Sequence, residues 1–169
     1  MIEPAELVMT RLGKVLRLSP ADRRLLVTAA LLQATIRLGL TLLPYRKLRG
    51  LVDRLARVSP HRHLAPPASP ERIAWAVTQA SRSVPGAACL TQALAAQVLL
   101  ERRGHPARVR VGIGRTEGAR LLAHAWVESE GRIVLGGTDL TQYTPLSTLD
   151  PLAPGGGEGQ GEGERRLAR

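Results

Sequence analysis

The chain has 169 residues, a length that suits one domain or a small domain with a helical extension. Its hydrophobic content of 44% is almost entirely aliphatic, because Phe is absent and Trp and Tyr number two each. So few aromatic side chains argue against a surface that stacks single-stranded nucleic acid. The single cysteine excludes an intramolecular disulfide framework, and no Cys/His cluster has the spacing of zinc ligands. We therefore expect a cytoplasmic protein with no bound metal or cofactor.

Most of the formal net charge of +10 lies in the N-terminal part of the chain. Residues 1–70 carry 12 basic and 4 acidic side chains, whereas residues 71–150 carry 9 and 7, and residues 151–169 carry 3 and 3. A basic surface attracts nucleic acid, anionic lipid or an acidic peptide, so charge alone does not select the partner.

The N-terminal part is predicted to be helical. Ser19, Pro20 and Asp22 form the start of a leucine-rich helix, with an N-cap serine, a proline at the first helical position and an acidic residue in the first turn. Pro44 ends this helix. Its longest apolar stretch, 25–36, is too short to cross a bilayer, so we expect no transmembrane segment.

A second, basic helix is predicted over residues 45–58, because Leu48, Leu51, Val52 and Leu55 recur at helical spacing. Prolines and then glycines interrupt the pattern further along the chain. We expect four segments: a helical N-terminal region (1–60), a Pro-rich linker (61–70), a core (71–150) and a disordered Gly-rich tail (151–169).

Helices then give way to strands. One helix is predicted over 70–83, and another begins at Cys89 and ends before Gly104, which suits a left-handed C-cap. The following residues alternate as three strands joined by glycine-containing turns, over 107–113, 122–128 and 132–135. The predicted fold class is therefore α+β, with the helix that bears Cys89 packed on a small antiparallel sheet.

Cys89 is a candidate nucleophile, because it stands at the predicted start of a helix that follows a Pro-Gly turn. The helix dipole and the free N–H groups of a first turn favour a thiolate at such a position. A free cysteine is also commonly a small buried apolar residue, and that alternative stays open at this point.

His124 is the candidate partner of this cysteine. Alternation along the predicted strand places His124, Trp126 and Glu128 on one face, a polar arrangement unlike that of a simple core strand. A hydrogen-bonded structural histidine is the alternative. The remaining histidines fall in predicted linker or loop sequence, where we expect them to be solvated: His61, His63 and His105.

A cysteine at a helix start, then a strand, then Ala-His-Ala-Trp-Val-Glu over 123–128 resembles the transglutaminase-like branch of the papain-type cysteine enzymes. Within that superfamily, segments 89–95, 100–107 and 123–128 are similar to the leader peptidase of lasso-peptide biosynthesis. The helical opening around 18–24 and the closing segment 143–146 also fit. The resemblance covers roughly residues 15 to 147.

The resemblance implies a cysteine peptidase that removes the leader of a ribosomally made lasso-peptide precursor, before a separate lasso cyclase closes the macrolactam ring. Cys89 would form a thioester with the substrate, and His124 would carry the proton to the leaving amine. This chain begins with leucine-rich helices and not with the strands of a fused leader-binding module, which implies a standalone form that works with a separate leader-binding protein. The basic helices are then its docking surface or a solvated face.

The third catalytic position departs from the family pattern. An Asp on the strand after the His usually orients the imidazole, but Gly136 or Gly137 stands at that position here. Asp139 is the nearest carboxylate and our predicted orienting residue. The alternative is a backbone carbonyl or a water molecule. Glu128 lies too far from His124, at about 13 Å along a strand.

Two other classes of function stay open. A Cys-His acyltransferase, which makes amide bonds, uses the same acyl-enzyme as a peptidase. A non-catalytic basic binding module predicts instead that Cys89 is unreactive and that binding weakens steeply with salt.

Overall fold

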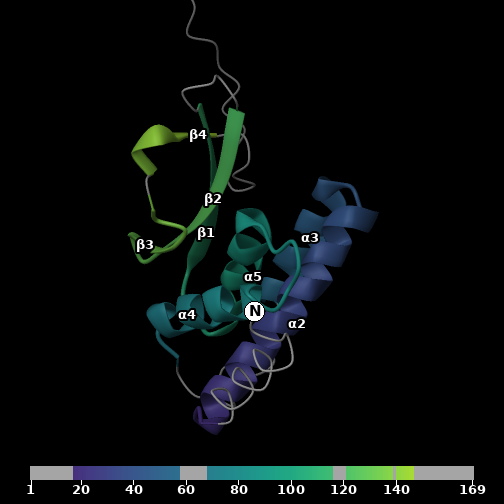
Figure 1. The fold of residues 1–169 in the computed structure, drawn as a ribbon, viewed down its shortest axis with the longest axis vertical. Helices are drawn as coiled ribbons and strands as arrows, with labels where there is room; N and C mark the ends of the chain where they lie inside the picture. The colour runs from purple at the N-terminus through teal and green to yellow at the C-terminus, as the bar shows by residue number, and fades with distance from the viewer. Residues whose placement is uncertain (1–16, 58–67, 116–120, 139, 147–169) are drawn as a thin grey trace, which may run out of the picture.

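The computed structural model describes residues 17–57, 68–115, 121–138 and 140–146. Four helices precede a small sheet in these ranges, which confirms the predicted α+β class (Figure 1). The helices are α2 (Pro20–Leu42), α3 (Tyr45–Arg57), α4 (Pro70–Ser81) and α5 (Cys89–Arg102). The strands are β1 (Ala107–Arg115), β2 (Leu121–Ser129), β3 (Arg132–Leu135) and β4 (Thr144–Pro145), with a 3₁₀ turn at Leu140–Gln142.

Two helices begin where the serine–proline pairs predict. The Ser19 hydroxyl accepts a hydrogen bond from the Asp22 N–H at 3.1 Å, and the Ser69 hydroxyl accepts one from the Arg72 N–H at 3.3 Å. In both helices the proline that follows the serine needs no N–H partner at the first helical position. These capping bonds satisfy first-turn donors that would otherwise lack a partner.

The strands form one antiparallel sheet in the order β3-β2-β1-β4. β1 and β2 pair along their whole length, from Ala107 opposite Ser129 to Arg115 opposite Leu121. Glu130 and Gly131 turn the chain from β2 to β3 with positive φ angles of 52° and 76°, as a tight hairpin requires. β4 was not predicted from the sequence.

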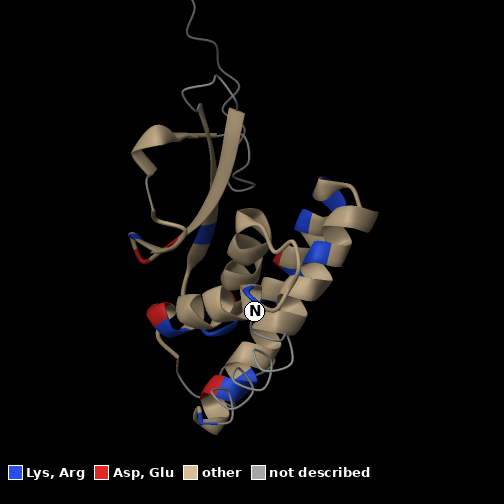
Figure 2. Ribbon diagram, in the orientation of Figure 1, with Lys and Arg blue, Asp and Glu red and all other residues tan. Residues whose placement is uncertain are grey.

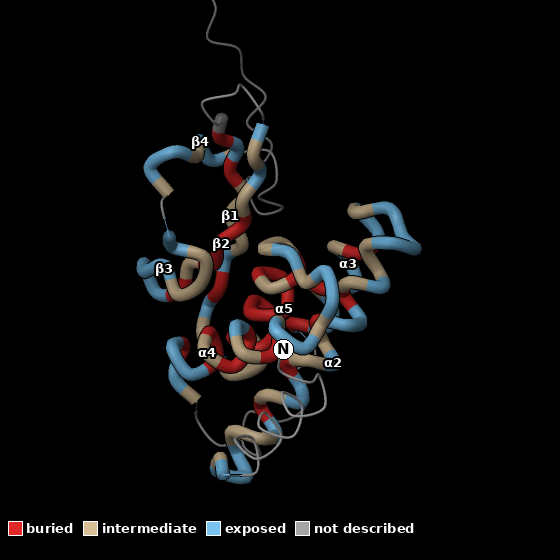
Figure 3. The backbone as a smooth tube through the Cα atoms, viewed as in Figure 1, coloured by how far each residue is buried: buried red, intermediate tan, exposed pale blue. Residues whose placement is uncertain are grey.

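Helix α5 lies between the sheet and the pair formed by α2 and α3 (Figure 1). Every residue from Ala93 to Leu100 on α5 is buried, as the continuous red stretch in Figure 3 shows. One face of α5 packs against Ala125 and Val127 of β2, and another packs against Ile36 of α2. The core is therefore continuous from the N-terminal helices to the sheet.

The N-terminal helices and the later elements thus share one core, although the sequence predicted a linker between them. The predicted linker, 61–70, lies mostly outside the described residues, and the predicted tail, 151–169, lies wholly outside them. The division into an N-terminal region and a separate core stays a prediction.

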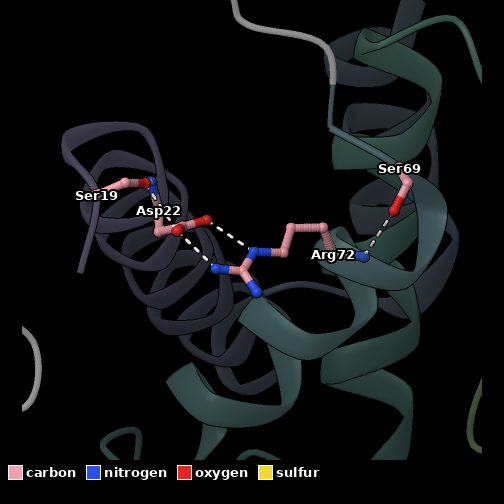
Figure 4. Close-up of polar contacts among 4 residues, drawn as sticks. All are labelled: Ser19, Asp22, Ser69 and Arg72. Atoms are coloured by element: carbon pink, nitrogen blue, oxygen red, sulfur yellow. Dashed lines mark hydrogen bonds and ion pairs between the residues drawn. The ribbon is translucent and has the colours of Figure 1, made fainter.

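A surface ion pair ties α2 to α4 (Figure 4). The Arg72 guanidinium donates two hydrogen bonds to the Asp22 carboxylate, at 2.8 and 2.6 Å, and also lies 4.3 Å above the ring of Trp75. The Ser19 hydroxyl donates a further hydrogen bond to Asp22 at 2.7 Å. Arg72 first, and Ser19 second, lower the pKa of Asp22 to about 2.

The sequence predicted that no helix crosses a bilayer, because the apolar stretch 25–36 is too short. Helix α2 is longer than that stretch. It has 23 residues, and an 18-residue window within it has a mean hydropathy of 1.7, so it meets the length and composition of a membrane span. In the folded chain 22% of that window is buried, and the Gln33 side chain donates a hydrogen bond to the Val77 carbonyl of α4. Core helices of water-soluble proteins meet the same criterion.

Candidate active site

Cys89 is the first residue of α5 and is half-buried. A tight loop delivers the chain to this position: the Ala88 N–H donates to the Gly86 carbonyl at 2.8 Å, and Gly86 adopts a positive φ of 70°. The Gln92 side chain donates back to the Ala87 carbonyl at 3.1 Å, which fixes the loop against the first turn of the helix. The sulfur therefore stands at a defined place at the helix end.

The N-terminus of α5 has no side-chain cap. Ala88 occupies the N-cap position and offers no acceptor, and the first turn of α5 contains no acidic residue. α2 and α4, in contrast, each have a serine cap and an acidic first-turn residue. The first-turn N–H groups of α5 are therefore left to bind an anion that develops beside Cys89.

The thiol lies against an edge of β2 that no strand covers within the described residues. β3 has four residues and pairs with β2 only at Val127, Glu128 and Ser129, so it ends before reaching the first half of β2. The Cys89 Sγ lies 4.0 Å from the carbonyl oxygen of Ala123 at this edge. The shortness of β3 thus makes room for the start of α5.

His124 follows Ala123 directly and presents a half-buried imidazole. Its Nε2 lies 2.9 Å from the carbonyl oxygen of Gly136. A carbonyl only accepts hydrogen bonds, so this contact requires the proton on Nε2 and leaves the Nδ1 lone pair as the acceptor. That tautomer is the one a base needs when it takes a proton through Nδ1.

Gly136 holds this carbonyl in place through a conformation that favours glycine. Its φ is 74°, in the left-handed region, and a Cβ there would lie 2.8 Å from the Ala125 carbonyl oxygen and 3.1 Å from the Trp126 Cα. Gly136, the first residue after β3, thus lies in close contact with β2. Cys89 and Gly136 therefore approach the same edge of β2, at Ala123 and Ala125 respectively.

Two aromatic rings lie near the imidazole. The Tyr143 ring lies 5.1 Å from the His124 ring, and the Trp126 ring lies 6.4 Å from it, both measured between centroids. Gly112, opposite His124 on β1, makes room for them, because a Cβ there would lie 2.9 Å from Trp126 and 3.0 Å from Tyr143. The Trp126 indole donates to Glu128 at 3.1 Å, which anchors the wall of the site.

The structure brings the two main candidates to one strand edge and leaves the third unplaced. The thiol of Cys89 contacts the Ala123 carbonyl and not the imidazole, which lies on the next residue of the chain. Asp139, and likewise His61 and His63, lie outside the described residues. No group of three or more His, Cys, Asp or Glu side chains that could hold a metal occurs within the described ranges.

The prediction that His105 is solvated is wrong. Its side chain is 25% exposed, its Nδ1 lies 3.1 Å from a Glu130 carboxylate oxygen, and its Nε2 lies 3.1 Å from the Ala68 carbonyl. The ring joins the start of α4 to the turn between β2 and β3. His105 is structural because two acceptors distant in the sequence, Glu130 and Ala68, both lie next to its ring. The residues around His105 in the sequence do not indicate these contacts.

The sequence left a backbone carbonyl open as the orienting group without assigning it to Gly136, and it gave no role to Tyr143 or Gln92. The Gly136 carbonyl orients the imidazole, Tyr143 covers it, and Gln92 fixes the loop before Cys89. The only sequence signal for the first was a Gly-Gly pair directly after a predicted strand. Gln92 and Tyr143 fell within the segments that carried the family resemblance, but nothing in their spacing indicated their contacts.

A family model described as the transglutaminase-like superfamily matches residues 30–148 of the chain. No curated protein and no solved structure matches the chain. The matched region begins within α2 and extends past β4, so it contains the cysteine, the histidine and the glycine whose carbonyl binds the imidazole.

Proposed function

Because the chain belongs to the transglutaminase-like superfamily, whose members act as cysteine peptidases or acyltransferases, we propose that it is a cysteine peptidase with Cys89 as nucleophile and His124 as proton carrier. One observation carries the proposal: the uncapped N-terminus of α5 and the residue before His124 meet at the same strand edge. The fixed tautomer of His124 supports its role as the base.

In the proposed mechanism the Nδ1 of His124 takes the thiol proton, and the Cys89 sulfur attacks the scissile carbonyl carbon. First-turn N–H groups of α5 stabilise the oxyanion that forms. The C–N bond then breaks, and His124 gives its proton to the leaving amine, which leaves a thioester on Cys89. A water molecule attacks the thioester while His124 takes a proton from it, and the carboxylate product departs as the thiol re-forms.

The substrate we propose is the precursor of a lasso peptide, cut between its leader and its core. The support is the similarity of segments 89–95, 100–107 and 123–128 to the leader peptidase of that biosynthesis. In this proposal the chain works in the cytoplasm with a separate leader-binding protein, and a separate cyclase acts on the product.

The nucleophile is tested by Cys89→Ala with mass analysis of the products. The wild-type chain should release free leader and core peptides from a precursor, and the variant should release neither while keeping its helical circular dichroism. A new cross-link in place of two free peptides would identify an acyltransferase. Wild-type turnover by Cys89→Ala would overturn the enzymatic proposal.

The proton carrier is tested by His124→Ala, with His105→Ala as the matched control. Loss of a positioned base should lower kcat/KM by at least ~10²-fold. His105 follows the C-terminal end of α5, whereas Cys89 begins the helix, and it binds two structural partners. Its replacement should therefore lower the melting temperature and leave kcat unchanged. Equal kinetic losses in both variants would remove His124 from its proposed role.

The orienting group is tested by Asp139→Ala. We retain Asp139 as a proposed member of the site, although the Gly136 carbonyl already accepts the Nε2 proton in the described structure. A loss of ~10²-fold or more in kcat without unfolding would assign Asp139 to the site. Retention of more than about a third of the activity would leave a Cys89–His124 pair oriented by the backbone alone.

Dependence on a leader-binding protein is tested by adding that protein to the cleavage reaction. Holding the leader raises the effective concentration of the cut site at Cys89, so the rate should rise with the partner and fall when the leader segment it grips is deleted. Full activity of the chain alone on a leaderless peptide would contradict this part of the proposal.

A further inference from the structure

Helix α2 exposes four large apolar side chains, which lie on one face of the helix. Figure 3 shows exposed segments along α2. Leu31, Leu38 and Leu42 are 64%, 58% and 70% exposed, and Val27 is 55% exposed. Their spacing of four, seven and four residues places them in a single stripe, which spans about 22 Å along the helix axis. We call this stripe the α2 face. Soluble chains rarely leave so long an apolar surface uncovered unless it meets a partner.

Three threonine hydroxyls beside this stripe are hydrogen-bonded within the helix itself. The hydroxyls of Thr28, Thr35 and Thr41 donate to carbonyls of their own helix, those of Arg24, Leu31 and Leu38, at 2.7 to 2.9 Å. Such internal bonds let a helix face leave water at little cost, as they do in helices that contact lipid. A medium that offers no hydrogen bonds therefore suits the α2 face.

Basic residues lie at both ends of the stripe. Arg24 is exposed one turn before Val27, and the exposed Arg46 and Lys47 follow Leu42 at the start of α3. Figure 2 colours the basic residues of α2 and α3 blue. Basic side chains next to an apolar stripe complement an anionic lipid surface, where their long stems reach the head groups.

The carboxylates of these two helices are already neutralised. Asp22 is the acid of α2 and is held by Arg72, and Asp53 is the acid of α3 and lies 3.1 Å from Arg49. They therefore do little to offset the attraction of the remaining arginines and lysine for an anionic surface.

We propose that the α2 face is a docking surface for the head-group and acyl boundary of an anionic membrane. Helix α2 lies in that boundary and does not cross it, because Leu25, Ala29 and Ile36 on its other side belong to the core. α5 lies between α2 and the sheet, so docking through the α2 face leaves the sheet on the far side of α5 from the lipid (Figure 1). The inference does not depend on the peptidase proposal.

Co-sedimentation of the full chain with vesicles tests the proposal. The wild-type chain should bind phosphatidylcholine vesicles that contain phosphatidylglycerol, and should bind pure phosphatidylcholine weakly. The pair Leu31→Asp with Leu38→Asp should weaken binding at least about tenfold, because two charges enter the apolar boundary. The pair Arg46→Glu with Lys47→Glu should weaken it by a similar factor, and only on the anionic vesicles.

The matched control changes two apolar side chains of the sheet, Leu121 and Ile133, which are 70% and 47% exposed. Leu121→Asp with Ile133→Asp should leave vesicle binding unchanged. A wild-type chain that ignores anionic vesicles would overturn the proposal, as would equal losses in the control. Dimerisation of the wild-type chain without lipid, abolished by Leu31→Asp with Leu38→Asp, would also overturn it, since a second copy would then cover the face. Leu31→Gln with Leu38→Gln replaces the aspartate pair if circular dichroism shows that pair unfolded.

Discussion

Gly136 positions the imidazole of His124 through its backbone, so a side chain added there should damage the site indirectly. An alanine Cβ would lie 2.8 Å from the Ala125 carbonyl and would force φ away from 74°, which moves the carbonyl that binds Nε2. We expect Gly136→Ala to lower kcat by about 10²-fold, because a shift of about 1 Å in a catalytic group has that effect. Steady-state kinetics on a precursor peptide would measure it.

Gly131 provides the control for this substitution. It has a similar φ of 76°, in the turn between β2 and β3, but a Cβ there would meet no atom within 4 Å. Gly131→Ala should cost about 1–2 kcal/mol of stability from its left-handed backbone and leave kcat unchanged. If both variants lost stability and neither lost activity, the Gly136 carbonyl would have no part in orienting His124.

The sequence singled out the cysteine and the histidine of the candidate site, but it left open whether Asp139, a backbone carbonyl or a water molecule binds the ring. Cys89 and His124 carry side chains whose chemistry is rare. Cys89 stood at a predicted helix start, and His124 stood within a predicted strand on a face with an unusual polar pattern. Every residue carries a carbonyl, so nothing local marked Gly136 as the one that faces Nε2. Its role depends on how far β3 extends along β2, which is a property of strand pairing and not of residue type.

The N-terminus of α5 has no side-chain cap, and a single substitution at Ala88 can supply one. Ala88 is an exposed N-cap with the extended backbone of a capping residue, so Ala88→Asp should bond first-turn N–H groups and stabilise α5 by about 0.5–2 kcal/mol. The same bonds occupy the proposed oxyanion donors and add a negative charge beside Cys89. We expect a rise in melting temperature together with a loss of about 10²-fold in kcat.

Two further variants separate the parts of this effect. Ala88→Ser caps the helix without a charge, so it shows how much of the loss comes from occupied donors alone. Ser69→Ala removes the cap of α4 and should cost about 1 kcal/mol of stability without changing kcat. An Ala88→Asp chain that gained stability and kept its rate would show that the first-turn N–H groups do not act on the substrate.

The helices were more predictable than the strands. Serine–proline pairs and a positive-φ glycine marked the ends of α2, α4 and α5 within the chain, and each signal acts through bonds to its own first or last turn. β4 has two residues, Thr144 and Pro145, too few for an alternating pattern, and it pairs with a strand more than thirty residues earlier. Such pairing depends on the assembled sheet, so it was missed.

The ion pair between Asp22 of α2 and Arg72 of α4 should make the stability of the fold depend on pH in the acid range. The pKa of Asp22 is lowered from 3.8 to about 2, so its contribution to stability is fully present above pH 3.8 and is lost as the pH falls towards 2. Asp22→Asn removes that contribution at every pH. We expect the melting temperatures of wild type and variant to differ near pH 5 and to converge near pH 2, as thermal circular dichroism would show. A constant difference across that range would contradict the assigned cause.

The continuous core predicts that the N-terminal helices unfold together with the sheet. Ile36 of α2 is 2% exposed and packs with residues of α3 and α5, whereas Leu38, two positions along, is 58% exposed. Ile36→Ala should therefore destabilise the chain by about 2–5 kcal/mol, and Leu38→Ala should change its stability by less than about 0.5 kcal/mol. Urea unfolding followed by both circular dichroism and tryptophan fluorescence would measure the two changes. Trp75 reports on α4 and Trp126 on β2, so in Ile36→Ala both signals should shift to lower urea together. A fluorescence transition that stayed in place while the helical signal shifted would show instead that the N-terminal helices form a separate folding unit, as a domain boundary at 61–70 requires.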